Sequence, residues 1–245
     1  MKRFLADLHI HTALSPCASE EMTPPAIVTE SIGLGLHLIA ICDHNSTGNI
    51  SAVQKAAGNK IVVLAGIEIT TAEEVHILGI FPDPLSASAV GKKVLATLPE
   101  STNASRGFGE QLLMDETGKV LATENKILSF ASSFTLSQTV KLIKDYKGLV
   151  IASHIDRPSY SVLSQLGIFP NNAGFDAVEV SPAGLASSRA AIYSAPGLPI
   201  VTSSDSHDLT TIGTCYSMLE MKKPTFEELA LTLKGIGERR IYNSA

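Results

Sequence analysis

Short runs of apolar residues recur along the chain, and most of them are separated by segments with a helical pattern. The runs that predict strands cover residues 3–8, 38–42, 61–67, 75–81, 148–152, 175–180, 198–202 and 215–219. Runs that are apolar at nearly every position are typical of strands buried on both faces, as in a parallel sheet covered by helices. The pattern predicts an α/β fold, with a closed or nearly closed barrel favoured over an open doubly wound sheet.

Helix signals lie between several of these strands. The predicted helices begin after Thr23, which precedes two prolines, at Thr135 or Ser137, and after Thr225. We expect the first to end near Gly33 or Gly35, the second before Gly148 and the third at about residue 236.

Residues 99–130 interrupt the alternation of strand and helix. Turn-forming residues are frequent in this segment, and it has no clear helical period. We therefore expect one domain over residues 1–245 with an insertion at about 99–130. The insertion is either a lid, from which Arg106 or Lys126 meets the substrate, or a surface excursion.

The composition is that of a globular protein with a sizeable core, because 44% of the 245 residues are hydrophobic and 18% are charged. The formal net charge is −5, from 19 basic and 24 acidic residues, and no basic run is longer than a pair. A nucleic-acid groove built on bulk positive potential is therefore not expected. With 5% aromatic residues there is also no extended path for base stacking, which favours a small-molecule partner over a polymer.

The sequence has no feature of a membrane or secreted protein. No apolar stretch approaches the roughly 20 residues that a membrane span needs, and the start of the chain predicts a strand instead of a signal sequence. The cysteines, Cys17, Cys42 and Cys215, are odd in number and far apart, which suits a reducing compartment better than a disulfide framework. We expect a cytoplasmic protein in which Cys42 and Cys215 are core residues.

Six of the seven histidines stand at the ends of predicted strands or just beyond them: His9, His11, His44, His76, His154 and His207. Acidic residues accompany them, among them Glu68 and Asp205. Residues i and i+2 of a strand face the same side, so His9 with His11, and Asp205 with His207, each present two ligands together. His37 lacks this setting, and we expect it to be structural.

These side chains are expected to meet at one place, because a parallel barrel brings the carboxyl ends of its strands to one mouth. Several imidazoles and carboxylates in one cleft compete for protons unless cations hold them, and this ligand mixture suits Zn, Mn and Fe. The ligands outnumber the three or four that one catalytic zinc takes, so two to three divalent metal ions are expected. Asp7, Asp43 and Asp156 flank the ligands and either orient imidazoles from behind or are solvated.

The order of these motifs along the chain is similar to that of a known family. The motifs at residues 7–12, 41–46, 66–70 with 75–79, 153–156 and 203–207 resemble, in order, those of the PHP (polymerase and histidinol phosphatase) family. The resemblance implies a distorted (β/α)7 TIM-like barrel. It also implies metal-dependent hydrolysis of phosphate esters at the carboxyl-terminal mouth of that barrel.

The resemblance further implies a set of metal ligands. One ion would be held by His9, His11, Glu68 and Asp205, and a second by Glu68, His76 and His154, with Glu68 bridging the two. A third would be held by His44 and His207. Its remaining ligand is usually an Asp in a Ser-Asp-Gly context, but Ser15-Pro16-Cys17 stands here. Glu21 is favoured as the replacement because a carboxylate suits the same metals, with Cys17 and Glu20 as alternatives.

The expected reaction is hydrolysis of a phosphomonoester of a small molecule or nucleotide. Glu68 and Asp205 would hold the metal pair around a water nucleophile, the third metal or a protonated His207 would stabilise the leaving oxygen, and Arg157 would bind the phosphate. The alternatives are phosphodiesterase or exonuclease-like cleavage of oligonucleotide ends, an amidohydrolase-like reaction, and a non-enzymatic metal-binding domain. The amidohydrolase ranks lower because no lysine stands at these strand ends to bridge the metals.

Overall fold

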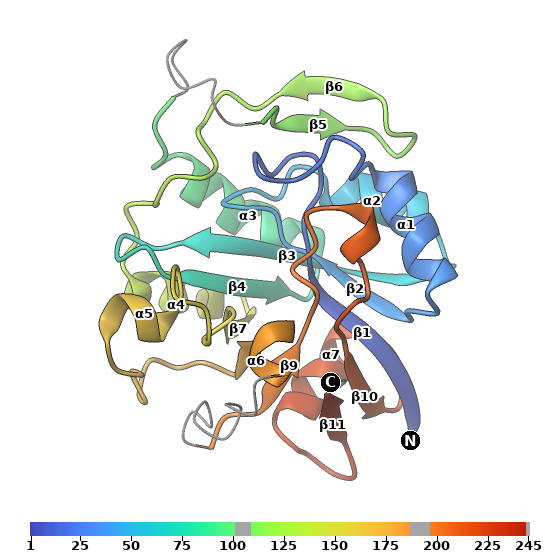
Figure 1. The fold of residues 1–245 in the computed structure, drawn as a ribbon, viewed down its shortest axis with the longest axis vertical. Coiled ribbons are helices and arrows are strands. Elements are labelled where there is room, and N and C mark those ends of the chain that lie inside the picture. Colours follow the sequence, from blue (N-terminus) through green and yellow to red (C-terminus); the bar gives the residue numbers. More distant parts are fainter. Residues whose placement is uncertain (101–108, 187–196, 244–245) are drawn as a thin grey trace.

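Nine strands form the main sheet of the molecule (Figure 1). The computed structural model describes residues 1–100, 109–186 and 197–243. The strands of the main sheet are β1 (Lys2–Ile10), β2 (Leu38–Ile41), β3 (Val62–Thr70), β4 (His76–Phe81), β7 (Leu149–Ala152), β8 (Ala177–Val180), β9 (Ile200–Thr202), β10 (Ser217–Met221) and β11 (Arg240–Asn243). Their order is β11-β10-β1-β2-β3-β4-β7-β8-β9, and each predicted strand run overlaps one of them.

The sheet is mixed, which corrects the expectation of a parallel one. Strands β1, β2 and β3 are parallel to one another, as are β7, β8 and β9, but β4 runs antiparallel to both β3 and β7. Only residues 71–75 join β3 to β4, and so short a connection returns the chain in the opposite direction. Thr70 therefore pairs with His76, and the amino end of β4 lies at the same edge as the carboxyl end of β3.

The two halves of the sheet meet beyond β9, where the chain returns to β1. The backbone N–H of His11 donates to the carbonyl of Ser206 at 2.9 Å, and the N–H of Ser206 donates to the carbonyl of His9 at 3.3 Å. At the carboxyl end of β9 itself, the N–H of Thr202 donates to Oγ of Ser217 in β10 at 2.8 Å. These bonds make the sheet a nearly closed, distorted barrel, which confirms the predicted fold class.

Helices follow most of the strands. They are α1 (Pro24–Gly33), α2 (Ile50–Ala57), α3 (Pro84–Leu95), α4 (Leu136–Asp145), α5 (Val162–Leu166), α6 (Pro182–Ala186) and α7 (Phe226–Leu233), with a short 3-10 helix at Leu209–Thr211. The predicted helix starts are confirmed, because the hydroxyls of Thr23, Thr135 and Thr225 each accept a backbone N–H of the first turn. Among the described residues, no helix is long and apolar enough to cross a membrane.

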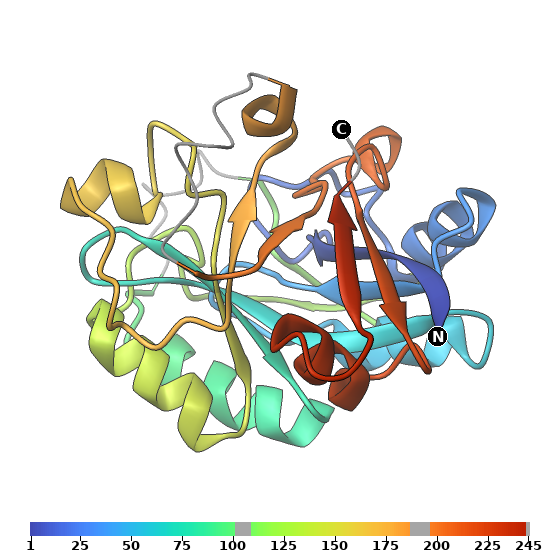
Figure 2. The ribbon, with the colours of Figure 1, turned by 90° about the horizontal axis from the view of Figure 1, so that it is seen from below.

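Both faces of the sheet are buried, as the continuous apolar runs predicted. In β2, Ile39 and Ile41 pack in a large cluster with side chains of α1 to α4. Leu38 and Ala40 point to the other face and pack in a second cluster that includes Leu229 of α7. Figure 2 shows α7 beside β10 and β11, where it covers this second face. Because successive side chains of a strand point to opposite faces of the sheet, the residues of one apolar run pack in two different cores.

Within the insertion, β5 (Leu112–Met114) and β6 (Val120–Thr123) form a hairpin that lies across one end of the molecule (Figure 1). Asn49, just before α2, ties this hairpin to the barrel. Its Nδ2 donates to the carbonyl of Leu112 and its Oδ1 accepts the N–H of Met114, both at 2.9 Å. The hairpin is therefore attached to the barrel through its backbone.

The insertion also contributes to a small core of its own. Leu128 is fully buried with Leu14 and Leu98, and the partly buried Leu113 packs against them. Leu121 is 65% exposed. Of the two residues expected to meet a substrate, Lys126 forms an ion pair with Glu100, and Arg106 lies outside the described residues.

Candidate metal centre

The structure brings every predicted metal ligand except Glu21 to one end of the barrel. His9 lies at the end of β1, Glu68 near the end of β3 and His76 at the start of β4, while His11, His44, His154, Asp205 and His207 follow the ends of β1, β2, β7 and β9. Asp205 and His207 are half-buried and the others are buried. The potential ligand atoms of all of them except His154 form three groups, in each of which the atoms lie within 4.8 Å of one another.

The first group consists of His9, His11, Glu68 and Asp205. Nε2 of His9 and Nε2 of His11 are 3.1 Å apart, and Oδ1 of Asp205 lies 3.2 Å from the first and 3.1 Å from the second. Glu68 approaches the same two nitrogens at 3.4 and 3.5 Å. Two imidazole nitrogens and two carboxylates thus surround one point.

Hydrogen bonds on the far side of each ring decide which nitrogen carries the proton. Nδ1 of His9 is 3.0 Å from the carboxylate of Glu179, which only accepts, so Nδ1 is the donor. Nδ1 of His11 is 2.9 Å from Oγ of Ser15, whose own proton goes to Asp43, so this Nδ1 is also a donor. The two Nε2 atoms face each other at 3.1 Å, so a cation between them would be bound by both lone pairs. Without a cation, the charges of Asp205, Glu179 and Glu68 outweigh burial and raise the pKa of His9 well above its usual range.

Glu68 provides a second sign that the site fits metal ions. Its Oε1 lies 3.1 Å from Nδ1 of His76 and 3.4 Å from Nε2 of His154, yet it accepts no hydrogen bond and is buried. An orphaned carboxylate oxygen in the interior is costly unless a cation satisfies it. Glu68 also belongs to the second group, with His44 and His76, so its carboxylate is placed to serve two ions.

The third group consists of His11, His44 and His207. Nδ1 of His207 donates to the carbonyl of Asp205 at 2.8 Å, which leaves its Nε2 with a lone pair. The rings of His11 and His207 stack with centroids 4.0 Å apart. Cys17 is an exposed residue of the preceding loop, and its thiol is not among the ligand atoms of this group.

Glu21, the favoured sequence candidate for the third metal, does not join any of these groups. Glu20 and Glu21 are exposed, whereas the next residue, Met22, is fully buried. The carbonyl of Met22 accepts the N–H of Ala13 at 2.9 Å, which holds this part of the loop in the core. None of the three sequence candidates for this position, Glu21, Glu20 and Cys17, belongs to the third group.

Close charges shift the pKa values of this centre. Burial lowers the pKa of His44, but the charge of Glu68 and the contact with Cys17 outweigh it and raise this pKa to about 10. Burial raises the pKa of Glu68, yet the imidazoles of His76 and His9 hold it well below its usual range. Burial also raises the pKa of Cys17, but hydrogen bonds to His207 and His44 bring it down to about 6. Cationic rings and anionic ligands thus stabilise each other at the mouth.

Two ligands have a left-handed backbone that residues other than glycine rarely adopt. The φ angle is 25° at His154 and 51° at Asp205. Such conformations cost about 1–3 kcal/mol each and are typical of functional sites. The conformation of His154 is held by its N–H, which donates to Glu179 at 3.2 Å, and by its carbonyl, which accepts the N–H of Arg157 at 2.9 Å.

Two residues that contact the ligands were missed in the sequence. The apolar run at 175–180 contains two charged residues, Asp176 and Glu179, and Glu179 lies between two valines, which was a usable signal. Tyr160 carries no such signal, because its role depends on where its loop returns. Its ring stacks on His76 at 4.6 Å between centroids, and its carbonyl accepts the N–H of His76 at 2.8 Å.

The flanking aspartates support backbone and hydroxyl groups. Asp7 accepts hydrogen bonds from Ser204, and Asp156 from Ser181, whereas Asp43 reaches a ligand ring only through Ser15. His37 lies before β2, at the opposite end of that strand from His44. Its Nδ1 accepts the N–H of Leu5 at 3.1 Å and its ring packs edge-on against Phe4.

Arg157 lies at the mouth with its side chain 40% exposed. Its Nη1 is 2.6 Å from Oδ2 of Asp205, while Oδ1 of the same carboxylate faces His9 and His11. The guanidinium therefore sits directly behind a candidate ligand, and its free edge is accessible from solvent.

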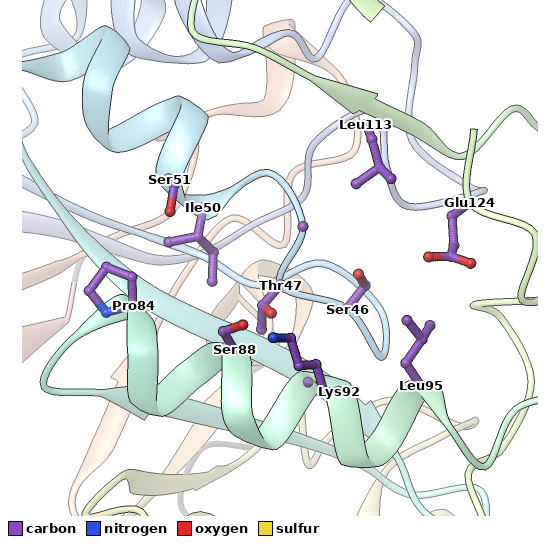
Figure 3. A pocket seen from close by; sticks show the side chains of 12 residues that line it. Ser46, Thr47, Ile50, Ser51, Pro84, Ser88, Lys92, Leu95, Leu113 and Glu124 are labelled. Carbon is purple, nitrogen blue, oxygen red and sulfur yellow. The ribbon is translucent and has the colours of Figure 1, made fainter. Parts of the chain in front are cut away.

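A separate cavity of about 310 Å³ lies between α2, α3 and the hairpin. Figure 3 shows the amine of Lys92 and the hydroxyls of Ser46 and Ser88 around it, with Leu113 above. No candidate metal ligand lines this cavity. The reacting group of a substrate is therefore expected at the open mouth.

Comparison with known families gives two matches. Residues 7–165 match the model of the PHP domain, and residues 189–235 match a model described as PHP-associated. The first match contains every ligand described above except Asp205 and His207, and the second contains those two.

Known proteins and structures are similar over nearly the whole chain. The uncharacterized protein YqxK of Bacillus subtilis is 26% identical over 98% of this chain and 64% of its own length. The lesion-specific endonuclease PfuEndoQ of Pyrococcus furiosus has a TM-score of 0.73 at 22% identity, over 98% of this chain and 58% of that one. A proposed metal-dependent phosphoesterase of Bifidobacterium adolescentis has a TM-score of 0.55 at 21% identity, over 82% and 87%. The chain thus spans less than two thirds of YqxK and of PfuEndoQ.

Proposed function

Because this chain belongs to the PHP domain family, we propose that it hydrolyses a phosphate ester, with a small-molecule or nucleotide phosphomonoester as the substrate. The observation that carries the proposal is the orphaned carboxylate of Glu68, shared between two groups of buried ligands. Bound divalent ions would supply positive charge that neutralises phosphate oxygens and makes a water molecule a better nucleophile.

We assign Glu68 to both ions whose ligand groups contain it, and Asp205 to the ion of the first group. Both carboxylates lie among imidazoles that keep them anionic, because the pKa of each is held well below its usual range. Nε2 of His9 and Nε2 of His11 would bind the same ion, and His76 and His154 face Oε1 of Glu68. Zn, Mn and Fe all suit these nitrogen and oxygen ligands.

Arg157 and His207 are assigned to the substrate side of the centre. The guanidinium of Arg157 is held in place by Asp205 and keeps donors free for two phosphate oxygens. The side chain of His207 is 30% exposed. Burial lowers the pKa of His207, but Cys17 and Asp205 outweigh this effect and raise it. A protonated His207 is suited to donate to the leaving oxygen when the third ion is absent.

We expect monoesters to react faster than diesters. The phosphate of a monoester is a dianion and that of a diester a monoanion, so a centre with several cations stabilises the monoester more strongly. The second candidate is cleavage of a phosphodiester in a nucleic acid. Its support is the similarity to PfuEndoQ, an endonuclease, over 98% of this chain. The net charge of −5 opposes it, because nucleic-acid binding relies on positive potential.

A substrate panel tests the proposal. The protein is purified without chelators, loaded with Mn, Zn or Fe, and assayed on p-nitrophenyl phosphate, bis-p-nitrophenyl phosphate, nucleoside monophosphates and short oligonucleotides. We expect turnover on monoesters and a loss of turnover with a chelator. The variant Glu68→Gln serves as the inactive control.

Two other results would each replace the proposal. Turnover that is confined to diesters and oligonucleotides would establish the second candidate. A protein that holds its metals and leaves the whole panel intact would instead indicate a non-enzymatic domain.

A further inference from the structure

An exposed aromatic ring lies against the metal centre. We propose that Tyr160 is a specificity-determining residue, whose open ring face stacks on a flat aromatic group of the substrate. Nucleotide and aryl phosphates would then be favoured over aliphatic phosphates. The inference rests on the proposed function and names a substrate class within it.

The ring of Tyr160 forms an outer layer over the second ligand group. It stacks on the imidazole of His76 with an interplanar angle of 22° and 4.6 Å between centroids. Nδ1 of His76 is in turn 3.1 Å from Oε1 of Glu68. His76 is buried, whereas Tyr160 is 41% exposed. A candidate ligand thus covers one face of the tyrosine ring, and the exposed area lies away from that ligand.

Tyr160 differs from Tyr242, the other exposed tyrosine among the described residues. The hydroxyl of Tyr242 donates to Glu220 at 3.1 Å, and the guanidinium of Arg3 lies over its ring at 5.2 Å from the centroid. In the part of the chain that the structure describes, the hydroxyl of Tyr160 forms no hydrogen bond, and its ring has no aromatic or cationic neighbour besides His76. Such a ring is suited to a flat partner that arrives from solvent.

The backbone of Tyr160 is strained, and two hydrogen bonds hold it. The φ angle is 56°, a left-handed conformation that is unfavourable for a bulky residue. The carbonyl of Tyr160 accepts the N–H of His76 at 2.8 Å, and Oγ of the next residue, Ser161, donates to the carbonyl of Arg157 at 2.8 Å. Glycine would relieve the strain and keep the backbone bond, so a tyrosine at this position points to a role for the side chain.

Arg157 belongs to the same loop and lies on the other side of the centre. Its guanidinium is 2.6 Å from Asp205 of the first ligand group, whereas Tyr160 lies against His76 of the second. A phosphate held near the ions by Arg157 would let the organic part of the ester extend over Tyr160. One ring offers one stacking partner, which fits a single base or aryl group better than a polymer.

Binding of phosphonates tests the inference without turnover. Phenylphosphonate and butylphosphonate carry the same charged group on a carbon that water does not displace, and only the first has a flat aromatic part. Calorimetry with the metal-loaded protein measures both affinities. We expect the wild-type protein to bind phenylphosphonate about ten- to a hundredfold more tightly, the gain expected from one stacked ring.

Variants identify the ring as the source of this preference. Tyr160→Phe should keep it. Tyr160→Gly, which suits the left-handed backbone, should abolish it while metal content and affinity for butylphosphonate stay unchanged. Tyr160→Leu keeps an apolar side chain beside His76 and should also lose the preference. Tyr242→Ala changes the other exposed tyrosine and is the matched control, with the wild-type preference expected.

Several outcomes would overturn the inference. Equal wild-type affinities for the two phosphonates would do so and would leave the proposed function standing. So would a preference that survives in Tyr160→Gly and Tyr160→Leu. If both variants lost metal and both phosphonates together, the ring would only support His76, and the inference would again be wrong. A protein that binds neither phosphonate would refute the proposed function and this inference with it.

Discussion

The carboxylate of Glu179 and the imidazole of His9 form a buried pair in which Oε2 lies 3.0 Å from Nδ1. The pair holds a ring proton on Nδ1, so that Nε2, which faces Asp205 and Glu68, is the nitrogen that a metal ion would bind. The same Oε2 accepts the N–H of His154, so one carboxylate positions ligands of both neighbouring ions. Glu179 is thus a positioning residue behind the metal centre.

Replacing Glu179 by glutamine should weaken metal binding without removing a ligand. A neutral amide stabilises the donor proton of His9 less than a carboxylate does, and we expect metal affinity to fall by about ten- to a hundredfold. Competition with a chromophoric chelator measures this affinity. Glu220→Gln changes a carboxylate that contacts Tyr242 away from the mouth and is the matched control. Equal affinities for both variants would refute the role of Glu179.

Glu68→Ala should remove about two metal ions per chain, because neither ion of the pair keeps its shared anionic ligand. Activity should fall with the metal content, and elemental analysis of the purified protein measures that content. His37→Asn is the control, since His37 contacts Leu5 and Phe4 and lies at the far end of β2. Retention of both ions by Glu68→Ala, or their loss from His37→Asn, would contradict the assignment.

Metal affinity should rise with pH through the neutral range. In the metal-free protein the pKa of His44 is raised to about 10, mainly because Glu68 outweighs burial, so this ring is protonated at pH 7. A metal ion must displace that proton, and affinity is expected to increase about tenfold per pH unit for each proton released. Calorimetry in buffers of different ionisation enthalpy counts the protons. A binding enthalpy independent of the buffer would show that none is released.

Arg157→Ala should raise KM for a phosphomonoester by about ten- to a hundredfold, the loss expected for a hydrogen bond to a charged group. Metal content should stay unchanged, because Asp205 keeps Oδ1 for the centre. Steady-state kinetics and elemental analysis together make the test. Metal loss with an unchanged KM would mean that Arg157 acts by holding Asp205 and does not bind the substrate.

The insertion should contribute to stability, which distinguishes it from a free lid. Leu128→Ala removes a fully buried side chain and is expected to cost about 2–5 kcal/mol of unfolding free energy. Leu121→Ala, at a position that is 65% exposed in the same insertion, should change it by less than about 0.5 kcal/mol. Denaturant titration measures both. Two equally small effects would mean that the insertion is detached from the core.

Much of the ligand set could be predicted from the sequence because the relevant signals are local. The apolar runs mark strands, and a polar residue where such a run ends stands at the edge of the sheet. His9 with His11 shows the two-residue period of a strand, and His37 was set aside because it precedes its apolar run. These inferences hold whichever way the strands are ordered.

The direction of β4 and the closure of the barrel were decided by tertiary structure. His76 reaches the mouth from the start of an antiparallel strand, not from the end of a parallel one. The apolar pattern is the same in both directions, since burial on two faces depends on neighbours and not on strand polarity. Only the pairing of β4 with β3 and β7 shows that β4 runs antiparallel to both.

The contacts that hold the ligands in place could not be predicted from the sequence. Glu179 is 170 residues from His9 along the chain, and nothing local relates the two. Cys17 and Glu21 are four residues apart, and both are exposed and outside the third group, whereas Met22 next to Glu21 is fully buried. The sequence by itself determined which residue types stand at the strand ends, because strand periodicity is local. Which of them meet, and which nitrogen each ring presents, depends on contacts that exist only once the barrel has closed.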